Sequence, residues 1–287
     1  MPRCGQVGHV GDASRRSARR GYTRGFKGLK GIMLLPKTAA ARIISCDVFD
    51  TLLYRDHRSE RQRFNDIAVL AAQRLAAERG IVRHPGAIYD ARLDVQKQAY
   101  RALDLSCPTG DVRFADMVDA MGRILSLDAQ AAEILHHAEI AIEIAQLTAN
   151  TVLLDWLRAQ VRSGCRIIAV SDTYHRGETI AQLLAARAPD HPVAQIYASA
   201  DHNATKRTGA LFKVVLRQEG VAAADILHIG DDTRADVTMA QAAGLRSLQV
   251  LRPKHLVFRR RADALRARAL HGFRIRAAHT QRAGAPA

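Results

Sequence analysis

Apolar and polar residues follow two different periods along this chain. Short apolar runs, each of a length suited to a buried strand, fall within residues 41–49, 166–170, 195–198, 225–229 and 247–250. From the second run on, they alternate with segments whose apolar residues recur at helical spacing, at about 151–162, 177–187, 208–219 and 234–243. This alternation is typical of a parallel sheet with helices on both faces. We therefore predict an α/β fold built on a Rossmann-like, doubly wound parallel sheet.

The long segment between the first two predicted strands has a helical pattern only. Ile67, Leu70, Ala71 and Leu75, for example, recur at a spacing that places them on one helix face. Because no strand interrupts this stretch, we predict that residues 55–149 form an all-helical cap. Residues 41–54 and 150–251 would then form the α/β core.

Positive charge is concentrated at the two ends of the chain. Residues 1–40 contain nine Lys or Arg and one Asp, and residues 252–287 contain ten and one, which leaves the body near neutral despite a net charge of +15. We expect both ends to be solvated, disordered tails, with weak contact to acidic partners as their one interaction. A basic amphipathic helix in residues 256–276 is the alternative. No specific nucleic-acid partner is predicted, and the sequence does not indicate an oligomeric state.

The cysteines and the hydropathy pattern favour an intracellular protein. Cys4, Cys46, Cys107 and Cys165 are widely separated and form no CxxC pair, so they indicate neither a disulfide framework nor a zinc site. No apolar run approaches the ~20 residues of a membrane span. We expect a cytoplasmic protein without a transmembrane segment.

Polar residues that can carry chemistry follow four successive predicted strands. In an open parallel sheet, ligands bind beyond the carboxyl ends of the strands. The residues at those ends are Asp47, Asp50 and Thr51 after the first strand; Ser171 and Asp172 after the second; Lys206 after the third; and Asp231, Asp232 and Asp236 after the fourth. We expect them to converge on one edge of the sheet and to form the active site.

The stretches around these residues resemble the four motifs of the haloacid dehalogenase (HAD) superfamily, in the same order. They are DVFDTLLYR, VSDTYH, KRTGALF and HIGDDTRAD. They are also similar to a branch of hydrolases associated with bacterial surface-polysaccharide enzymes. The resemblance spans residues 41–251 and implies a HAD-like hydrolase, with the helical segment as its cap.

The resemblance implies a nucleophile and a metal site. Asp47 would attack phosphorus and form an aspartyl-phosphate, since Thr51 follows it at the spacing of the first motif. Mg²⁺ would be held by Asp47, the backbone carbonyl of Phe49 and Asp231. Either Asp232 or Asp236 would complete or orient this shell.

The remaining motif residues are expected to bind the substrate. Lys206 would neutralise the phosphate and hold the nucleophile, while the hydroxyls of Ser171 and Thr51 would donate hydrogen bonds to phosphoryl oxygens. Asp172 and Arg55 are further candidates for substrate contact, because both lie beside motif residues. Lys213 is a rival to Lys206, but it falls within a predicted helix and is expected on a solvated face.

Phe49 departs from the pattern of the superfamily's phosphatases. Their residue at this position is an Asp that protonates the leaving group, which Phe49 cannot do; such acid catalysis is typically worth ~10²–10⁴-fold in rate. His57, His175 or Asp50 could replace the missing acid, or the reaction could need none, as when a halide leaves. Asp50 can equally be a turn residue without a catalytic role.

Three functions follow from these observations. The first is a Mg²⁺-dependent phosphatase acting on a small phosphorylated metabolite such as a sugar phosphate. The second is a dehalogenase-like or phosphonate-cleaving hydrolase, and the third is a weakly active or inactive HAD-like binding module. The carboxylates after the fourth strand favour the first of these, because they suit a bound metal.

Overall fold

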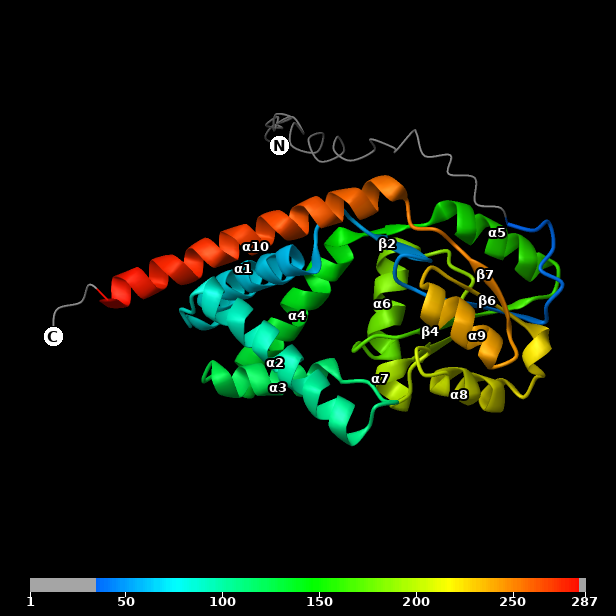
Figure 1. Cartoon of the computed structure of the whole chain (residues 1–287), viewed down its shortest axis with the longest axis horizontal. Coiled ribbons are helices and arrows are strands. Elements are labelled where there is room, and N and C mark those ends of the chain that lie inside the picture. The colour runs from blue at the N-terminus through cyan, green and yellow to red at the C-terminus, as the bar shows by residue number, and fades with distance from the viewer. Residues whose placement is uncertain (1–34, 284–287) are drawn as a thin grey trace, which may run out of the picture. The chain divides into compact units, whose positions relative to one another are not determined.

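The structure, a computed structural model, describes residues 35–283, and it describes side chains as far as residue 269 (Figure 1). Most of the N-terminal extension predicted for residues 1–40 lies outside the described residues.

A five-stranded parallel sheet forms the centre of the α/β part. Its strand order is β5-β4-β1-β6-β7, so the first strand in the sequence lies in the middle. In register, Ser45 of β1 lies between Ile168 of β4 and His228 of β6. The predicted fold class is therefore confirmed. The strand bounds are β1 Ile43–Cys46, β4 Arg166–Ser171, β5 Gln195–Ala198, β6 Ile226–Gly230 and β7 Arg246–Gln249.

Helices cover both faces of this sheet because alternate side chains of its strands point to opposite sides. Ile44 and Cys46 of β1 pack in one cluster with the apolar residues of two helices, and Ile43 packs in another cluster with two others. The first pair is α5 (Thr151–Arg162) and α6 (Gly177–Arg187), and the second pair is α8 (Ala210–Glu219) and α9 (Met239–Ala242). Shorter pieces are α7 (Ser199–His202), the 3₁₀ turn Ala223–Asp225 and the π-helical turn Thr233–Thr238.

Four of the helices between β1 and β4 pack around a separate apolar core. They are α1 (Glu60–Arg79), α2 (Pro85–Ser106), α3 (Phe114–Ile124) and α4 (Ala129–Gln146). The chain enters and leaves this helical segment through a short antiparallel pair, β2 (Leu53–Arg55) and β3 (Leu147–Ala149), which the sequence pattern does not predict. Ser59 caps the N-terminus of α1, and Gly80 ends the helix in a left-handed conformation, as glycine allows.

The basic C-terminal segment differs from our prediction of a disordered tail. It forms a long helix, α10 (Lys254–Ala283), which runs alongside α1 in Figure 1 and contacts it. The contacts are specific: Asp263 of α10 accepts hydrogen bonds from the backbone N–H of Ser59 (2.8 Å) and from its hydroxyl (2.6 Å). The helix agrees with the alternative given for residues 256–276, whereas its contacts with α1 depend on partners distant in the chain.

Among the described residues, no helix combines the length and the apolar character needed to cross a membrane.

Candidate active site

The carboxyl ends of β4, β1 and β6 bring three motif residues together. These strands are neighbours in the sheet, so Ser171 at the end of β4 and Asp231 after β6 lie on either side of Asp47 after β1. The Ser171 hydroxyl donates to Asp47 Oδ1 (3.1 Å), and the Thr51 hydroxyl donates to Asp231 Oδ1 (3.3 Å). All four side chains are buried or nearly so.

Lys206 reaches the same point from the loop before α8. Its ammonium group donates to Asp47 Oδ1 (2.8 Å) and to Asp236 Oδ1 (2.5 Å). Burial alone would lower the pKa of Lys206, but the carboxylates of Asp47 and Asp236 outweigh it and raise that pKa. The lysine therefore stays charged at the centre of the site, whereas Lys213 is solvent-exposed on α8 as expected.

Asp172 holds the backbone of the lysine loop. Its carboxylate accepts hydrogen bonds from the backbone N–H groups of Lys206 (2.6 Å) and Arg207 (3.1 Å). Because both of its oxygens bind this loop, its place in the structure is that of a residue that positions Lys206. The substrate contact expected for Asp172 stays a prediction.

Asp47, Asp231 and Asp236 form a cluster whose carboxylate oxygens lie within 4.8 Å of one another. Burial raises the pKa of Asp47 to about 7, and the charges of Asp236 and Asp231 add to this effect while Lys206 opposes it. Burial also raises the pKa of Asp231. For Asp236, burial is outweighed by Lys206 and His228, and its pKa is lowered.

The cluster fits a divalent cation. Carboxylate oxygens are the hard ligands that Mg²⁺ prefers, and crowded buried carboxylates with raised pKa values gain most from added positive charge. Asp47, Asp231 and Asp236 would hold the ion. The sequence also proposed Asp232, but the structure separates it from the cluster: its Oδ1 accepts from the backbone N–H of Arg234 (2.9 Å) and Ala235 (2.7 Å), so it caps the following helical turn.

A buried chain of hydrogen bonds through His228 and Ser45 holds the Asp236 carboxylate in place. The Nε2 atom of His228 lies 3.1 Å from Asp236 Oδ1, and its Nδ1 atom lies 2.7 Å from the Ser45 hydroxyl. Burial lowers the pKa of His228, so the ring is neutral, donates from Nε2 and accepts from the hydroxyl at Nδ1. Gly230 is required beside this chain, because a Cβ atom there would lie 2.2 Å from Asp236 Cγ.

Phe49 offers no acid, and two of the three candidate replacements, His175 and Asp50, do not supply one. The ring is buried, and the Arg55 guanidinium carbon lies 3.9 Å from the ring centroid. Arg55 also forms an ion pair with Glu143 of α4 (3.2 Å), and the substrate contact expected for Arg55 stays a prediction. Burial lowers the pKa of His175 to about 4, which leaves that candidate acid neutral near pH 7.

Asp50 is buried in an unusual backbone conformation. The φ angle of Asp50 is +59°, a left-handed value that favours glycine, and the residue is 6% exposed. Arg260 of α10 forms two hydrogen bonds to its carboxylate, at 2.7 and 2.8 Å. Burial would raise the pKa of Asp50, but Arg260 outweighs it, with help from Arg55 and Arg252, so this pKa is lowered and the group cannot replace the missing acid.

Two residues at this site were not predicted from the sequence as site residues: Arg252 and Arg260. Arg252 precedes α10, and its Nε atom contacts a carboxylate oxygen of Asp231 and lies 3.6 Å from Asp50. The one sequence signal that could have revealed them is Asp50 itself, since a buried carboxylate needs a cationic partner.

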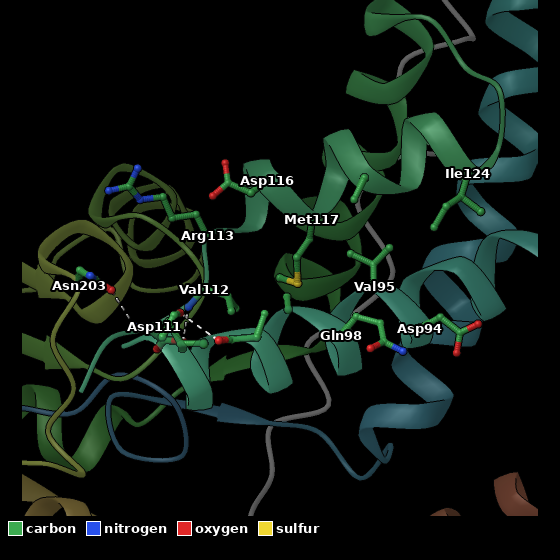
Figure 2. Close-up of a pocket in the computed structure, with 15 residues that line it drawn as sticks. Asp94, Val95, Gln98, Asp111, Val112, Arg113, Asp116, Met117, Ile124 and Asn203 are labelled. Carbon is green, nitrogen blue, oxygen red and sulfur yellow. Dashed lines mark hydrogen bonds between the residues drawn. The ribbon is translucent and has the colours of Figure 1, made fainter. Parts of the chain in front are cut away.

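A separate cavity of about 690 Å³ lies away from this cluster, between α2 and α3 (Figure 2). Val95, Met117 and Ile124 line it, with Asp111 and Asn203 at one end. None of the motif residues lines this cavity, so it does not belong to the candidate active site.

Comparison with known proteins agrees with this geometry. A family model of haloacid dehalogenase-like hydrolases matches residues 41–244. The chain belongs to this family. The finer resemblance to a branch of polysaccharide-associated HAD hydrolases stays a prediction, and no curated protein matches the sequence.

Solved structures of HAD proteins are similar to this chain at low sequence identity. A 2-haloacid dehalogenase from Pseudomonas syringae pv. Tomato has 18% identity and a TM-score of 0.51, over 73% of this chain and 86% of its own. A HAD family enzyme from Bacteroides thetaiotaomicron has 15% identity and a TM-score of 0.49, over 74% and 95% of the two chains. At these identities the likeness shows the fold alone, so the substrate of this HAD hydrolase has to be argued from its own residues.

Proposed function

We propose that this HAD hydrolase is a Mg²⁺-dependent phosphatase that acts on a small phosphorylated metabolite through an aspartyl-phosphate at Asp47. The observation that carries the proposal is the cluster of Asp47, Asp231 and Asp236 around the ammonium group of Lys206. Three crowded carboxylates suit a bound cation, which phosphoryl transfer uses and halide release does not require. Mg²⁺ bound there would offset the repulsion between a phosphate group and the anionic nucleophile.

The hydrogen bonds of Asp47 leave one oxygen for attack. Oδ1 accepts from Ser171 and Lys206, while no described residue donates a hydrogen bond to Oδ2. Oδ2 attacks phosphorus, and the bond from phosphorus to the leaving oxygen breaks with its electron pair. Water then cleaves the aspartyl-phosphate, which restores the carboxylate and releases inorganic phosphate.

The absence of an acid at Phe49 restricts the leaving group. Asp50 is held ionised by Arg260, and His175 is held neutral by burial, so neither donates a proton. His57 is the remaining candidate of the three. Without its proton, the leaving oxygen departs as an anion and takes its proton from water. Esters of acidic alcohols, acyl phosphates and aryl phosphates suit this site better than simple alkyl phosphates.

The test is a panel of phosphate esters graded by leaving-group acidity, assayed with Mg²⁺ or EDTA. We expect Mg²⁺-dependent hydrolysis of the aryl ester, loss of at least about a hundredfold in Asp47→Asn, and a steep fall in rate toward alkyl esters. Asp90→Asn is the matched control, because Asp90 is exposed on α2. Folded protein that hydrolyses no ester on the panel would contradict the proposal.

Halide release is the second candidate, and Phe49 is the observation that favours it. A halide leaves without a proton, so an aromatic residue at this position carries no penalty in that reaction. Chloride release from 2-chloropropionate in EDTA, abolished in Asp47→Asn, would support it. If no chloride appears while the aryl phosphate is hydrolysed with Mg²⁺, this candidate is excluded.

A further inference from the structure

Arg252 and Arg260 come from a part of the chain beyond the family match. That match ends at residue 244, and both arginines follow it. Yet their guanidinium groups contact two carboxylates near the nucleophile, Asp231 after β6 and Asp50 in the turn after Asp47. The C-terminal segment therefore adds cationic groups to a site that the family pattern describes without them.

The docking of α10 fixes where these groups lie. Arg260 donates to both oxygens of Asp50 and to the backbone carbonyls of Arg55 and Asp56. One turn further along α10, Asp263 accepts two hydrogen bonds from Ser59. Both ends of the segment between the nucleophile turn and α1 are thus fastened to α10, and this contact brings the start of α10 to the edge of the site.

Arg252 and Arg260 differ in how firmly they are held. The Arg260 side chain is 18% exposed and has four hydrogen bonds, so it is a structural anchor. The Arg252 side chain is 45% exposed, and its contacts are with Asp231 and, more distantly, Asp50. A half-exposed guanidinium can turn toward another anion without leaving an unpaired group in the interior.

The charges at the site favour a movement of the Arg252 side chain away from Asp231 when a cation and a phosphate group bind. Asp231 is also one of the three carboxylates suited to a cation, so Arg252 and a divalent cation compete for the same negative charge. A phosphate group held at Asp47 would lie close to Arg252, because the Asp47 and Asp231 carboxylates are within 4.8 Å of each other. Arginine binds phosphate with two parallel hydrogen bonds, which makes it well suited to that contact.

We propose that Arg252 is a substrate-binding residue, which exchanges Asp231 for the phosphoryl group of the substrate when a divalent cation occupies the carboxylate cluster. The assignment rests on the proposed phosphatase function, and it adds a specificity residue from outside the matched family region. The group that Arg252 recognises is then a dianionic phosphoryl group.

The test measures two affinities in the full chain, so that it does not depend on turnover. Mn²⁺ is titrated into the wild type, Arg252→Gln and Arg261→Gln, and inorganic phosphate is then titrated into each protein with saturating Mg²⁺. Arg261 is the matched control, since it is exposed on α10 and its loss changes the net charge equally. Arg252→Lys serves as a second variant that keeps the charge but loses the paired hydrogen bonds.

Two opposite changes are expected in Arg252→Gln. Mn²⁺ should bind about threefold more tightly, because a half-exposed competing charge is gone. Phosphate should bind roughly tenfold or more weakly, because a charge-assisted contact is lost. Arg252→Lys should fall between wild type and Arg252→Gln for phosphate, and Arg261→Gln should match the wild type in both titrations.

Unchanged Mn²⁺ affinity in Arg252→Gln would overturn the competition for Asp231, and unchanged phosphate affinity would overturn the substrate contact. A wild type that binds no phosphate would overturn the proposal as well. If instead no ester is hydrolysed but both titrations behave as expected, the phosphatase function fails while Arg252 remains a phosphate ligand.

Discussion

The burial of His175 should make the stability of this protein depend on pH in a defined window. The residue is 1% exposed, packs against Phe114 (ring centroids 5.2 Å apart) and Tyr174 (4.5 Å), and neither ring nitrogen has a hydrogen-bond partner among the described residues. Burial lowers its pKa from 6.5 to about 4, although Glu139 and Glu143 oppose this. The folded state therefore binds the proton less tightly than the unfolded state.

The sign follows from linkage. Above pH 6.5 both states carry a neutral ring, and the contribution of His175 to stability is fully present. As the pH falls from 6.5 to about 4, His175 becomes protonated in the unfolded chain but stays neutral in most of the folded protein. The free energy of unfolding therefore decreases. Between about pH 8 and pH 4 the loss amounts to about 3 kcal/mol of unfolding free energy.

His175→Phe should remove this dependence. Phenylalanine keeps the ring in the same apolar surroundings and removes two buried nitrogens without partners, so stability at pH 8 should be equal to or above that of the wild type. The assay is urea unfolding followed by circular dichroism at pH 8, 6 and 4. The quantity of interest is the difference between variant and wild type, because the contribution of Asp47, whose pKa is raised, has the opposite sign and cancels in that difference.

The exposed His137 provides a control, since His137→Gln removes a histidine without changing the interior. The difference between His175→Phe and wild type should grow by about 3 kcal/mol in favour of the variant as the pH falls from about 8 to 4. A difference that stays constant over this range would refute the reasoning and show that His175 has the same pKa in the folded protein as in the unfolded chain.

Three further predictions concern the site and the cap. Gly230→Ala should displace the Asp236 carboxylate and weaken Mg²⁺ binding about tenfold or more, as measured by calorimetry; unchanged affinity would contradict the close approach. Arg92→Met should lower the free energy of unfolding by about 3–5 kcal/mol, because it leaves Glu139 buried without its partner, and adding Glu139→Leu should restore most of the loss; additive losses would contradict this. At low Mg²⁺, activity should rise with pH through about 7 as Asp47 ionises, and saturating Mg²⁺ should shift that rise to lower pH. If the pH of the rise does not change with Mg²⁺, Asp47 is not a ligand of the cation.

The sequence predicts the sheet and the meeting of its motif residues because both depend on local patterns. Alternating apolar runs and helical segments define a parallel sheet, and the carboxyl ends of its neighbouring strands necessarily meet. Asp47, Ser171 and Lys206 therefore come together as expected. Sequence reasoning did not separate the duties of Asp236 and Asp232, because the same carboxylate can either face a cation or cap a helical turn. That choice depends on the backbone direction of a few residues.

Local pattern allowed a helix in residues 256–276 but not its docking, and the basic residues of the segment favoured a solvated tail. Their partners are far away in the chain, and no periodicity connects Arg260 with Asp50. What the sequence does contain is a carboxylate, Asp50, that requires a cationic partner. Asp50 lies within a turn of apolar neighbours, and the arginine nearest to it in sequence, Arg55, is engaged by Glu143.

A buried carboxylate whose local cation is already engaged implies a cation from elsewhere in the chain. The left-handed backbone at Asp50 strengthens this requirement, because strain of the order of 1–3 kcal/mol persists only when surrounding contacts hold the residue in place. Arg260 provides those contacts, and with it α10 acquires a fixed position. The excess of positive charge at the C-terminus is therefore partly the complement of the acidic site. Removing Arg260 should loosen α10 and the turn after Asp47 together, rather than either one alone.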